Sequence, residues 1–364
     1  MKGRPIREIL LGGDAGHRGS VHGAAFHNEI RVFTDERVRL SANGSWAGRP
    51  AKVEDAVALA TQMLPAHRSF DSDLYEEMEA MSQAAGISPA EAVIVGGFTD
   101  FVDVVRANGA SGSLAEEDDC TAAIIPDELA GGAGFLAQTW DMHDSATEHV
   151  TLIRVAPETG PTALVFTTVG CLGQIGMNEA GIAVGINNLT AASGRIGVTW
   201  PFVVRKALAQ RSIEEALVVV LEADLAGAHN YLLFDANGVG YNVEAMPGYR
   251  AVTDVNHEPL VHTNHCLNEE ARRFEAPRPP DLLESSVERL SIASDLLAKW
   301  VATGDALTEH HLIDLTREAE AICRRSTPPH HNETAGAAVM RPGTGELWAC
   351  WGLPIENDFE AFRV

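Results

Sequence analysis

The spacing of hydrophobic and polar positions changes along the 364 residues, and each change predicts a different kind of element. Residues 52–64 carry apolar side chains on one helical face, and Pro65 is expected to end that helix. Ser88-Pro89-Ala90-Glu91 has the form of a capping box with proline at the first helical position. Together with a short apolar strand at Ile9–Gly13 and a second helix at 72–85, this predicts a mostly helical N-terminal third.

Beyond residue 119 the chain reads as short β-rich runs separated by Gly, Pro, Asp and Glu. Predicted strands are 121–125, 135–140, 150–155, 162–169, 181–185 and 260–267, with hairpins at 231–241 and 337–351. Predicted helices begin near Pro201, at the Ser212 capping box (to Ala223), at 282–301 and at 307–322. Consecutive strands favour antiparallel pairing. We therefore predict an α+β fold, a four-layer αββα sandwich of two antiparallel sheets between helix layers.

The stretch between the two patterns, residues 106–119, is polar and ends in four consecutive acids, Glu116 to Asp119. Such a composition is typical of an exposed loop, and the simplest interpretation is a surface connector. The loop runs directly into Cys120. This junction divides the chain into a mostly helical region, 1–119, and a mostly β region, 120–364.

Composition narrows the class of protein. Apolar residues make up 45% and charged residues 21%, as in ordinary globular proteins. A net charge of −24 argues against nucleic acid or an anionic membrane surface as a partner. We expect a cytoplasmic protein, because no membrane span or signal peptide is evident and five scattered cysteines suggest reduced thiols. A higher homo-oligomer is left open.

Cys120 is the first candidate for chemistry. A cysteine near the start of a strand is most often a small buried hydrophobe. An exposed loop before it also suits self-cleavage, in which the thiol attacks the Asp119 carbonyl, the acyl group shifts from N to S, and water releases the upstream chain. The new α-amine, with an ordinary pKa of about 7.7–8.0, can then act as base for the thiol.

Four separated segments carry a resemblance to a known family. They are the glycine-rich segment ending in His22-Gly23, Cys120-Thr121 with Gln138–Asp141, Gly176–Val184 continuing to Asn187, and Val261–Leu267. In these segments the chain resembles the acyl-coenzyme A:isopenicillin N acyltransferase family, cysteine members of the N-terminal nucleophile (Ntn) hydrolases. The resemblance implies maturation by cleavage before the cysteine, giving two associated fragments that form one structural unit.

The resemblance also implies roles for individual residues. Cys120 corresponds to the nucleophile, and Asp119 to the residue whose carbonyl is attacked. Asp141 corresponds to the acid that orients the nucleophilic residue, although a turn aspartate is the alternative. Asn264 corresponds to the oxyanion donor, with a structural turn residue as the alternative. Asn187 corresponds to a second asparagine at the site, and its neighbour Asn188 could serve instead.

The chain departs from the family pattern in two places, of which the first bears on the penicillin substrate and the second on the rate or pH dependence of self-cleavage. Penicillin-forming members carry an arginine where this chain reads 329–334, and a glycine often stands where this chain has Asp119. The rim of the substrate site is expected to include Thr121, His262 and His331. A metal site at His262 and His265 is the weaker alternative, because i and i+3 on a strand face opposite sides. No metal or cofactor is therefore expected.

These observations predict a self-processing cysteine amidohydrolase that releases an amine from a small N-acyl amide or peptide-like substrate. Its protein partner would be its own cleaved N-terminal fragment. Acyl transfer from a thioester to an amine is the alternative within enzymes. An uncleaved binding protein with an inert Cys120 is the alternative outside them.

Overall fold

The computed structural model describes residues 4–44, 46, 48, 50–108, 119–328 and 331–364. Its larger sheet has the strand order β1 (Glu8–Gly13), β4 (Val150–Pro157), β5 (Ala163–Thr168), β6 (Ile175–Asn178), β7 (Ile182–Leu189), β8 (Ala228–Asp235), β9 (Gly240–Met246), β10 (Tyr249–Asp254). The smaller sheet has the order β11 (Leu260–His262), β2 (Asp119–Ile125), β3 (Phe135–His143), β12 (Asn332–Arg341), β13 (Glu346–Trp351), β14 (Glu360–Arg363).

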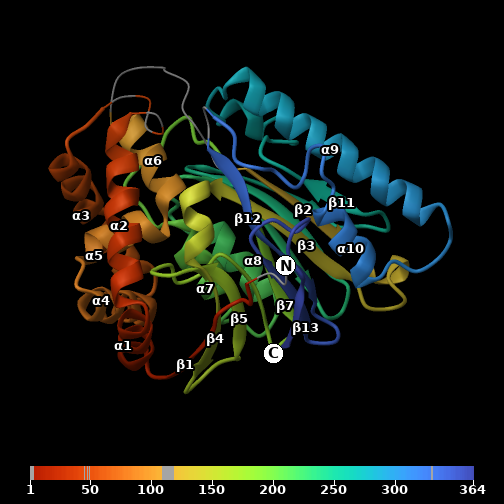
Figure 1. Cartoon of the computed structure of the whole chain (residues 1–364), viewed down its shortest axis with the longest axis horizontal. Coiled ribbons are helices and arrows are strands. Elements are labelled where there is room, and N and C mark those ends of the chain that lie inside the picture. Colours follow the sequence, from red (N-terminus) through yellow and green to blue (C-terminus); the bar gives the residue numbers. More distant parts are fainter. Residues whose placement is uncertain (1–3, 45, 47, 49, 109–118, 329–330) are drawn as a thin grey trace.

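The helices of the described chain are α1 (Ala15–Ala25), α2 (His27–Asn43), α3 (Val53–Phe70), α4 (Ser72–Ala85), α5 (Pro89–Gly96), α6 (Phe98–Ala107), α7 (Trp200–Ala207), α8 (Ile213–Glu222), α9 (Pro280–Val301) and α10 (Glu309–Thr316). Helices α1 to α6 gather on one side of the sheets, and α9 lies across the opposite side (Figure 1). The two sheets pack between these layers, which confirms the predicted αββα sandwich of α+β class. No helix of the described chain is long and apolar enough to span a bilayer.

Alternation along β2 decides which layer each of its side chains meets. Cys120, Ala122 and Ile124 belong to the core between the sheets. Ala123 and Ile125 belong to a second core that includes residues of α9 and α10. Asp119 and Thr121 therefore lie on the α9 face of the strand, and the Cys120 side chain lies on the face toward the larger sheet.

Several predicted elements are confirmed. Ser88 accepts from the Glu91 backbone and its own N–H donates to the Glu91 carboxylate, so the α5 capping box is complete. The 231–241 hairpin is formed by β8 and β9, and Gly238 at its turn has a φ of 79°. Of the predicted exposed loop, residues 109–118 lie outside the described part of the chain. Its two ends are not loop: residues 106 and 107 belong to α6, and Asp119 is a fully buried residue of β2.

Three predicted boundaries are wrong. Helix α3 continues through Pro65 to Phe70, because Met63 and His67 are buried on either side of it and anchor both turns. The 260–267 strand ends at His262, because Thr263 and Asn264 turn to bond Ser286 of α9. The predicted 307–322 helix is only Glu309–Thr316.

One sheet pairing also differs from the prediction. Strand β1 pairs with β4 in parallel, whereas the other pairings of the larger sheet are antiparallel. The chain reaches β4 only after six helices, so this edge of the sheet is closed by a strand from far upstream in the sequence.

Candidate active site

Cys120 is the second residue of β2 and stands opposite Trp140 of β3. Its side chain is 1% exposed and borders a cavity of about 10 Å³. The cavity is lined mainly by apolar side chains, with Asn188, Gln174, Thr99 and His229 as polar members. A cavity of this size holds about one water molecule, so the thiol of the uncleaved chain is closed off from any substrate.

The backbone of Cys120 is held on both sides by buried side chains. Its N–H donates to Oδ1 of Asn264 at 2.7 Å. Its carbonyl accepts from Nη1 of Arg289 at 2.6 Å and from Nδ2 of Asn187 at 3.3 Å. The predicted residues Asn264 and Asn187 therefore both reach Cys120, from 144 and 67 positions away in the sequence.

Asn264 is fixed in one orientation by its own neighbours. Oδ1 also accepts from Nη2 of Arg289 at 3.0 Å, and Nδ2 donates to the carbonyl of Asn188 at 3.0 Å. The Asn264 N–H donates to Oγ of Ser286 at 2.9 Å. The early end of β11 thus places Asn264 between β2 and α9, where one amide contacts both the Cys120 nitrogen and the β7 backbone.

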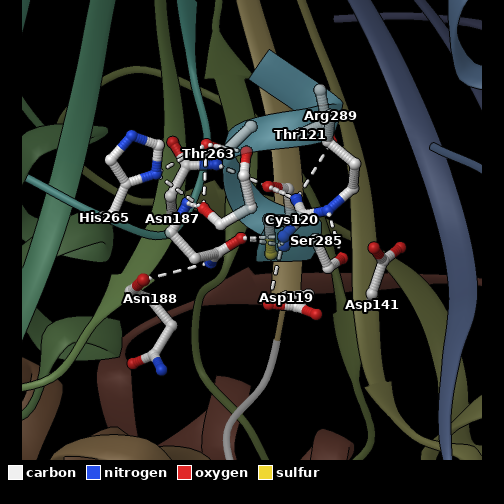
Figure 2. Close-up of polar contacts among 12 residues, drawn as sticks. Asp119, Cys120, Thr121, Asp141, Asn187, Asn188, Thr263, His265, Ser285 and Arg289 are labelled. Carbon is white, nitrogen blue, oxygen red and sulfur yellow. Dashed lines mark hydrogen bonds and ion pairs between the residues drawn. The ribbon is translucent and has the colours of Figure 1, made fainter. Parts of the chain in front are cut away.

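Asp119 is buried on the α9 face of β2, among three arginines. Oδ1 lies 3.1 Å from Nη2 of Arg289 and 3.3 Å from Nη2 of Arg278, and Oδ2 pairs with Arg324. Figure 2 shows Arg289 above the Asp119–Cys120 segment, with Asp119 and Asp141 beneath it. We call Arg278, Arg289 and Arg324 the arginine cluster. It fixes the residue whose carbonyl self-cleavage would attack.

Asp141 lies directly opposite Asp119 in the β2–β3 register, so it shares the α9 face and does not line the thiol cavity. Oδ1 accepts from Oγ1 of Thr334 at 2.7 Å, and Oδ2 has no hydrogen-bond partner among the described residues. Burial raises the pKa of Asp141 to about 7, while the charge of Arg289 acts in the other direction.

The three predicted rim residues do not line the thiol cavity. Thr121 accepts from Nη1 of Arg289 at 3.2 Å on the α9 face. His262 is fully buried, with Nε2 3.0 Å from Oε1 of Glu244. His331 is exposed, 3.4 Å from Asp144. Within the described residues, no group of three His, Cys, Asp or Glu side chains is placed to hold a metal ion, and His330 lies outside them.

The arginine cluster was not predicted from the sequence, although Arg289 left a signal. The buried positions of α9 are Leu282, Ser286, Arg289, Ala293 and Leu297, which follow the helical period. An arginine on the apolar face of a helix needs a buried acid as partner. That spacing therefore marks Arg289, whereas Arg278 and Arg324 lie outside helices and carry no comparable signal.

A second group of residues that was not predicted from the sequence borders the thiol cavity, and two of its members, Thr99 and Asp100, come from the N-terminal region. Nε2 of His229 lies 3.2 Å from Oγ1 of Thr99, and Nδ1 lies 3.0 Å from Oδ1 of Asp100. Oδ2 of Asp100 accepts from the N–H of Trp200 at 2.7 Å. Thr99 and Asp100 belong to α6, so residues before Cys120 form part of the cavity wall.

Comparisons with known proteins show which family the chain resembles in sequence. Residues 129–356 match the family described as acyl-coenzyme A:6-aminopenicillanic acid acyl-transferase. The chain is 26% identical over 252 residues to the acyl-coenzyme A:6-aminopenicillanic-acid-acyltransferase 40 kDa form of Emericella nidulans. That alignment covers 68% of this chain and 66% of the relative, just under two thirds of the relative's length. Asp141, Asn187 and Asn264 lie inside the matched residues, and Cys120 precedes them.

Two solved structures are similar to the chain. The Caenorhabditis elegans ortholog of N-acylethanolamine-hydrolyzing acid amidase has a TM-score of 0.42 and 16% identity, covering 62% of this chain and 93% of that one. Conjugated bile acid hydrolase from Clostridium perfringens, as a point variant, has a TM-score of 0.44 and 13% identity, covering 67% of this chain and 97% of that one.

Proposed function

Because this chain belongs to the acyl-coenzyme A:6-aminopenicillanic acid acyltransferase family, we propose that it is an acyl-transferring enzyme that cleaves N-acyl amides through a thioester on Cys120. Its nucleophile becomes available when the chain cuts its own Asp119–Cys120 bond. The observation that carries the proposal is the set of hydrogen bonds to the Cys120 backbone, from its N–H to Asn264 and to its carbonyl from Arg289 and Asn187. The Cys120 side chain meanwhile borders a separate cavity.

Self-cleavage would proceed in two balanced steps. The Cys120 sulfur adds to the Asp119 carbonyl carbon, the C–N bond breaks, and the thiol proton passes to the departing nitrogen, leaving an aspartyl thioester. Water then adds to the thioester carbon and the C–S bond breaks, which releases the Asp119 carboxylic acid and restores the thiol. The arginine cluster supports both steps because it fixes the side chain of the reacting acyl group.

In the mature enzyme the new α-amine accepts the thiol proton, and the thiolate attacks the amide carbonyl of the substrate. Asn264 is proposed to hold the amine through Oδ1, as it holds the Cys120 N–H before cleavage. The Nδ2 of Asn264 then releases the Asn188 carbonyl and donates its hydrogen bond to the oxyanion of the tetrahedral intermediate instead. The protonated amine gives its proton to the leaving nitrogen, and water hydrolyses the acyl-enzyme. Asn187 remains a donor to the Cys120 carbonyl.

The two fragments are proposed to remain one structural unit after cleavage. Strand β1 of the first fragment pairs with β4 of the second. Glu77 of α4 is buried against Arg205 of α7, and Oδ2 of Asp103 accepts from the N–H of Ala191. These contacts are independent of the Asp119–Cys120 bond, so the bond can break without opening them.

Purified protein tests the proposal directly. We expect fragments of 119 and 245 residues (364 − 119) on a denaturing gel, with Cys120 at the start of the larger one by mass spectrometry. Cys120→Ala should remain a single chain without amidase activity. Cys350→Ala, at another buried cysteine, is the matched control and should cleave normally.

Persistence of the full-length wild-type chain after long incubation would support the uncleaved binding protein instead. Amidase activity in Cys120→Ala would show that another residue is the nucleophile. Acyl transfer is the second candidate function because the family is described by that activity. Excess amine in the assay distinguishes the two, since transfer yields a new amide where hydrolysis yields the free acid.

A further inference from the structure

The arginine cluster encloses a carboxylate next to the proposed nucleophile. Asp119 is fully buried, and the side chains of Arg289 and Arg278 are 0% and 2% exposed. Arg324 is 22% exposed and is therefore the member of the cluster that solvent reaches. Three guanidinium groups thus converge on one carboxylate, each within ion-pair distance.

A second acid, Asp141, lies beside the cluster on β3. Its Oδ1 accepts from Thr334 and its Oδ2 has no hydrogen-bond partner among the described residues, so in this structure Asp141 bonds none of the three arginines. Arg289 also donates to the neutral Cys120 carbonyl and Thr121 hydroxyl, and Arg278 donates to the Asn264 carbonyl. Buried cations are costly without an anionic partner. If Asp119 leaves the cluster after cleavage, the cluster then favours entry of another anion.

The geometry of Asp119 specifies where that anion sits relative to the reacting carbon. In the aspartyl thioester, the acyl group carries a carboxylate separated from the thioester carbonyl by two carbons. That spacing is the spacing of a succinyl group. Deacylation of this thioester and of a mature acyl-enzyme are the same reaction, addition of water and loss of the Cys120 thiol.

Resting on the proposed function, we infer that the mature site prefers amides of four-carbon dicarboxylic acids, with the distal carboxylate of the acyl group bound by Arg278, Arg289 and Arg324. Self-cleavage is then the first turnover of the enzyme, with Asp119 as the acyl group. The thiol attacks the succinyl amide carbonyl, the C–N bond breaks with proton transfer to the amine, and water releases the dicarboxylic acid.

Two chromogenic amides that differ only in the carboxylate test this inference on the processed protein. N-succinyl-4-nitroanilide and N-butyryl-4-nitroanilide have the same acyl length, and both release 4-nitroaniline. We expect kcat/KM to favour the succinyl amide by roughly 10- to 100-fold, the size of a lost charge-assisted hydrogen bond. Arg324→Gln should lower the succinyl-to-butyryl ratio. Arg325→Gln, which breaks a surface pair with Glu356, should not change it.

Other outcomes would overturn the inference. A wild-type ratio near or below one would do so, even if Arg324→Gln fails to process. Cleavage of N-butyryl-4-aminobenzoate that is faster than cleavage of N-succinyl-4-nitroanilide would also overturn it, because the carboxylate of that compound lies in the amine half. Chromatography measures this reaction. Failure on both succinyl and butyryl probes, with cleavage of another N-acyl nitroanilide, would also refute it while sparing the proposed function. Processed protein inactive on every N-acyl amide would refute the proposed function itself.

Discussion

The side chains of neighbouring residues in β2 lie on opposite faces of the strand and meet different partners, because strand side chains alternate. The Cys120 thiol lies on the face toward the larger sheet, and Asp119 and Asp141 lie together on the α9 face. The Cys120 backbone connects the two faces, through Asn264 and Arg289. The β2–β3 register thus places Asp141 opposite Asp119 and one position from the residue opposite Cys120.

The buried carboxyl of Asp141 should make stability depend on pH. Its pKa rises from 3.8 to about 7 in the folded chain. Between these values the folded chain retains a proton that the unfolded chain has lost, so this group lowers stability as pH rises through that window. Asp141→Asn, made in the uncleavable Cys120→Ala chain, should therefore gain Tm over its parent progressively from about pH 4 to above pH 7. Its amide oxygen can still accept from Thr334.

Scanning calorimetry across that range checks this expectation. Asp305→Asn, at an exposed loop acid, is the matched control and should track the parent. Parallel curves of Tm against pH for Asp141→Asn and the parent would contradict the raised pKa.

At the level of residues, the sequence could identify groups that belong to short motifs. Asn264 and Asn187, to which the family resemblance assigns roles at the site, contact the Cys120 backbone. The predicted meeting of the thiol, the Asp141 carboxylate and the Asn264 amide around one cavity is not what the uncleaved chain shows. The reason is register, because the pairing of Asp119 with Asp141 depends on the length of the turn between β2 and β3.

Elements differ in how far local sequence determines them. Helix α5 begins where its capping box requires, since both hydrogen bonds are made within four residues. The ends of helix α3 and strand β11 depend instead on tertiary contacts. His67 in the last turns of α3 bonds Thr199, and Asn264 just after β11 bonds Ser286 of α9. Helix α9 carries the site's largest unpredicted contribution, because Arg289 and Ser286 meet partners that are distant in sequence.

A buried ion network joins three helices on the far side of the molecule from α9. Glu77 of α4 contacts Arg18 of α1 at 2.7 Å and Arg205 of α7 at 3.0 Å. Glu77→Gln, in the Cys120→Ala chain, should cost about 3–5 kcal/mol, because it leaves two buried guanidinium groups without their acid. Urea unfolding measures the loss.

The matched control is Glu79→Gln on the same helix, whose carboxylate lies 3.7 Å from an exposed Arg68. It should change the free energy of unfolding by less than about 0.5 kcal/mol. Equal effects of the two substitutions would mean that the buried network does not hold α1, α4 and α7 together. In the processed wild-type sequence, Glu77→Gln should also weaken fragment association during gel filtration.

For the whole molecule, composition and strand order predicted the αββα class, but the closure of the larger sheet required the structure. Strand β1 returns to pair with β4 across six intervening helices, and no local signal fixes such a pairing. The proposed cleavage would thus divide the covalent chain into 1–119 and 120–364, while the sheet and the cavity wall include residues from both parts.

The burial of Cys120 beside a closed cavity should make the uncleaved chain resistant to oxidation. All five cysteines are buried, and burial raises the pKa of Cys171 and Cys323 to about 11, far from the thiolate form that oxidants attack. Intact protein should therefore take up no iodoacetamide in its native state, and processed protein should take up one equivalent, at Cys120. Equal uptake in both would contradict this. Under the proposed maturation, the uncleaved chain would thus be a storage form whose nucleophile is protected from oxidative damage.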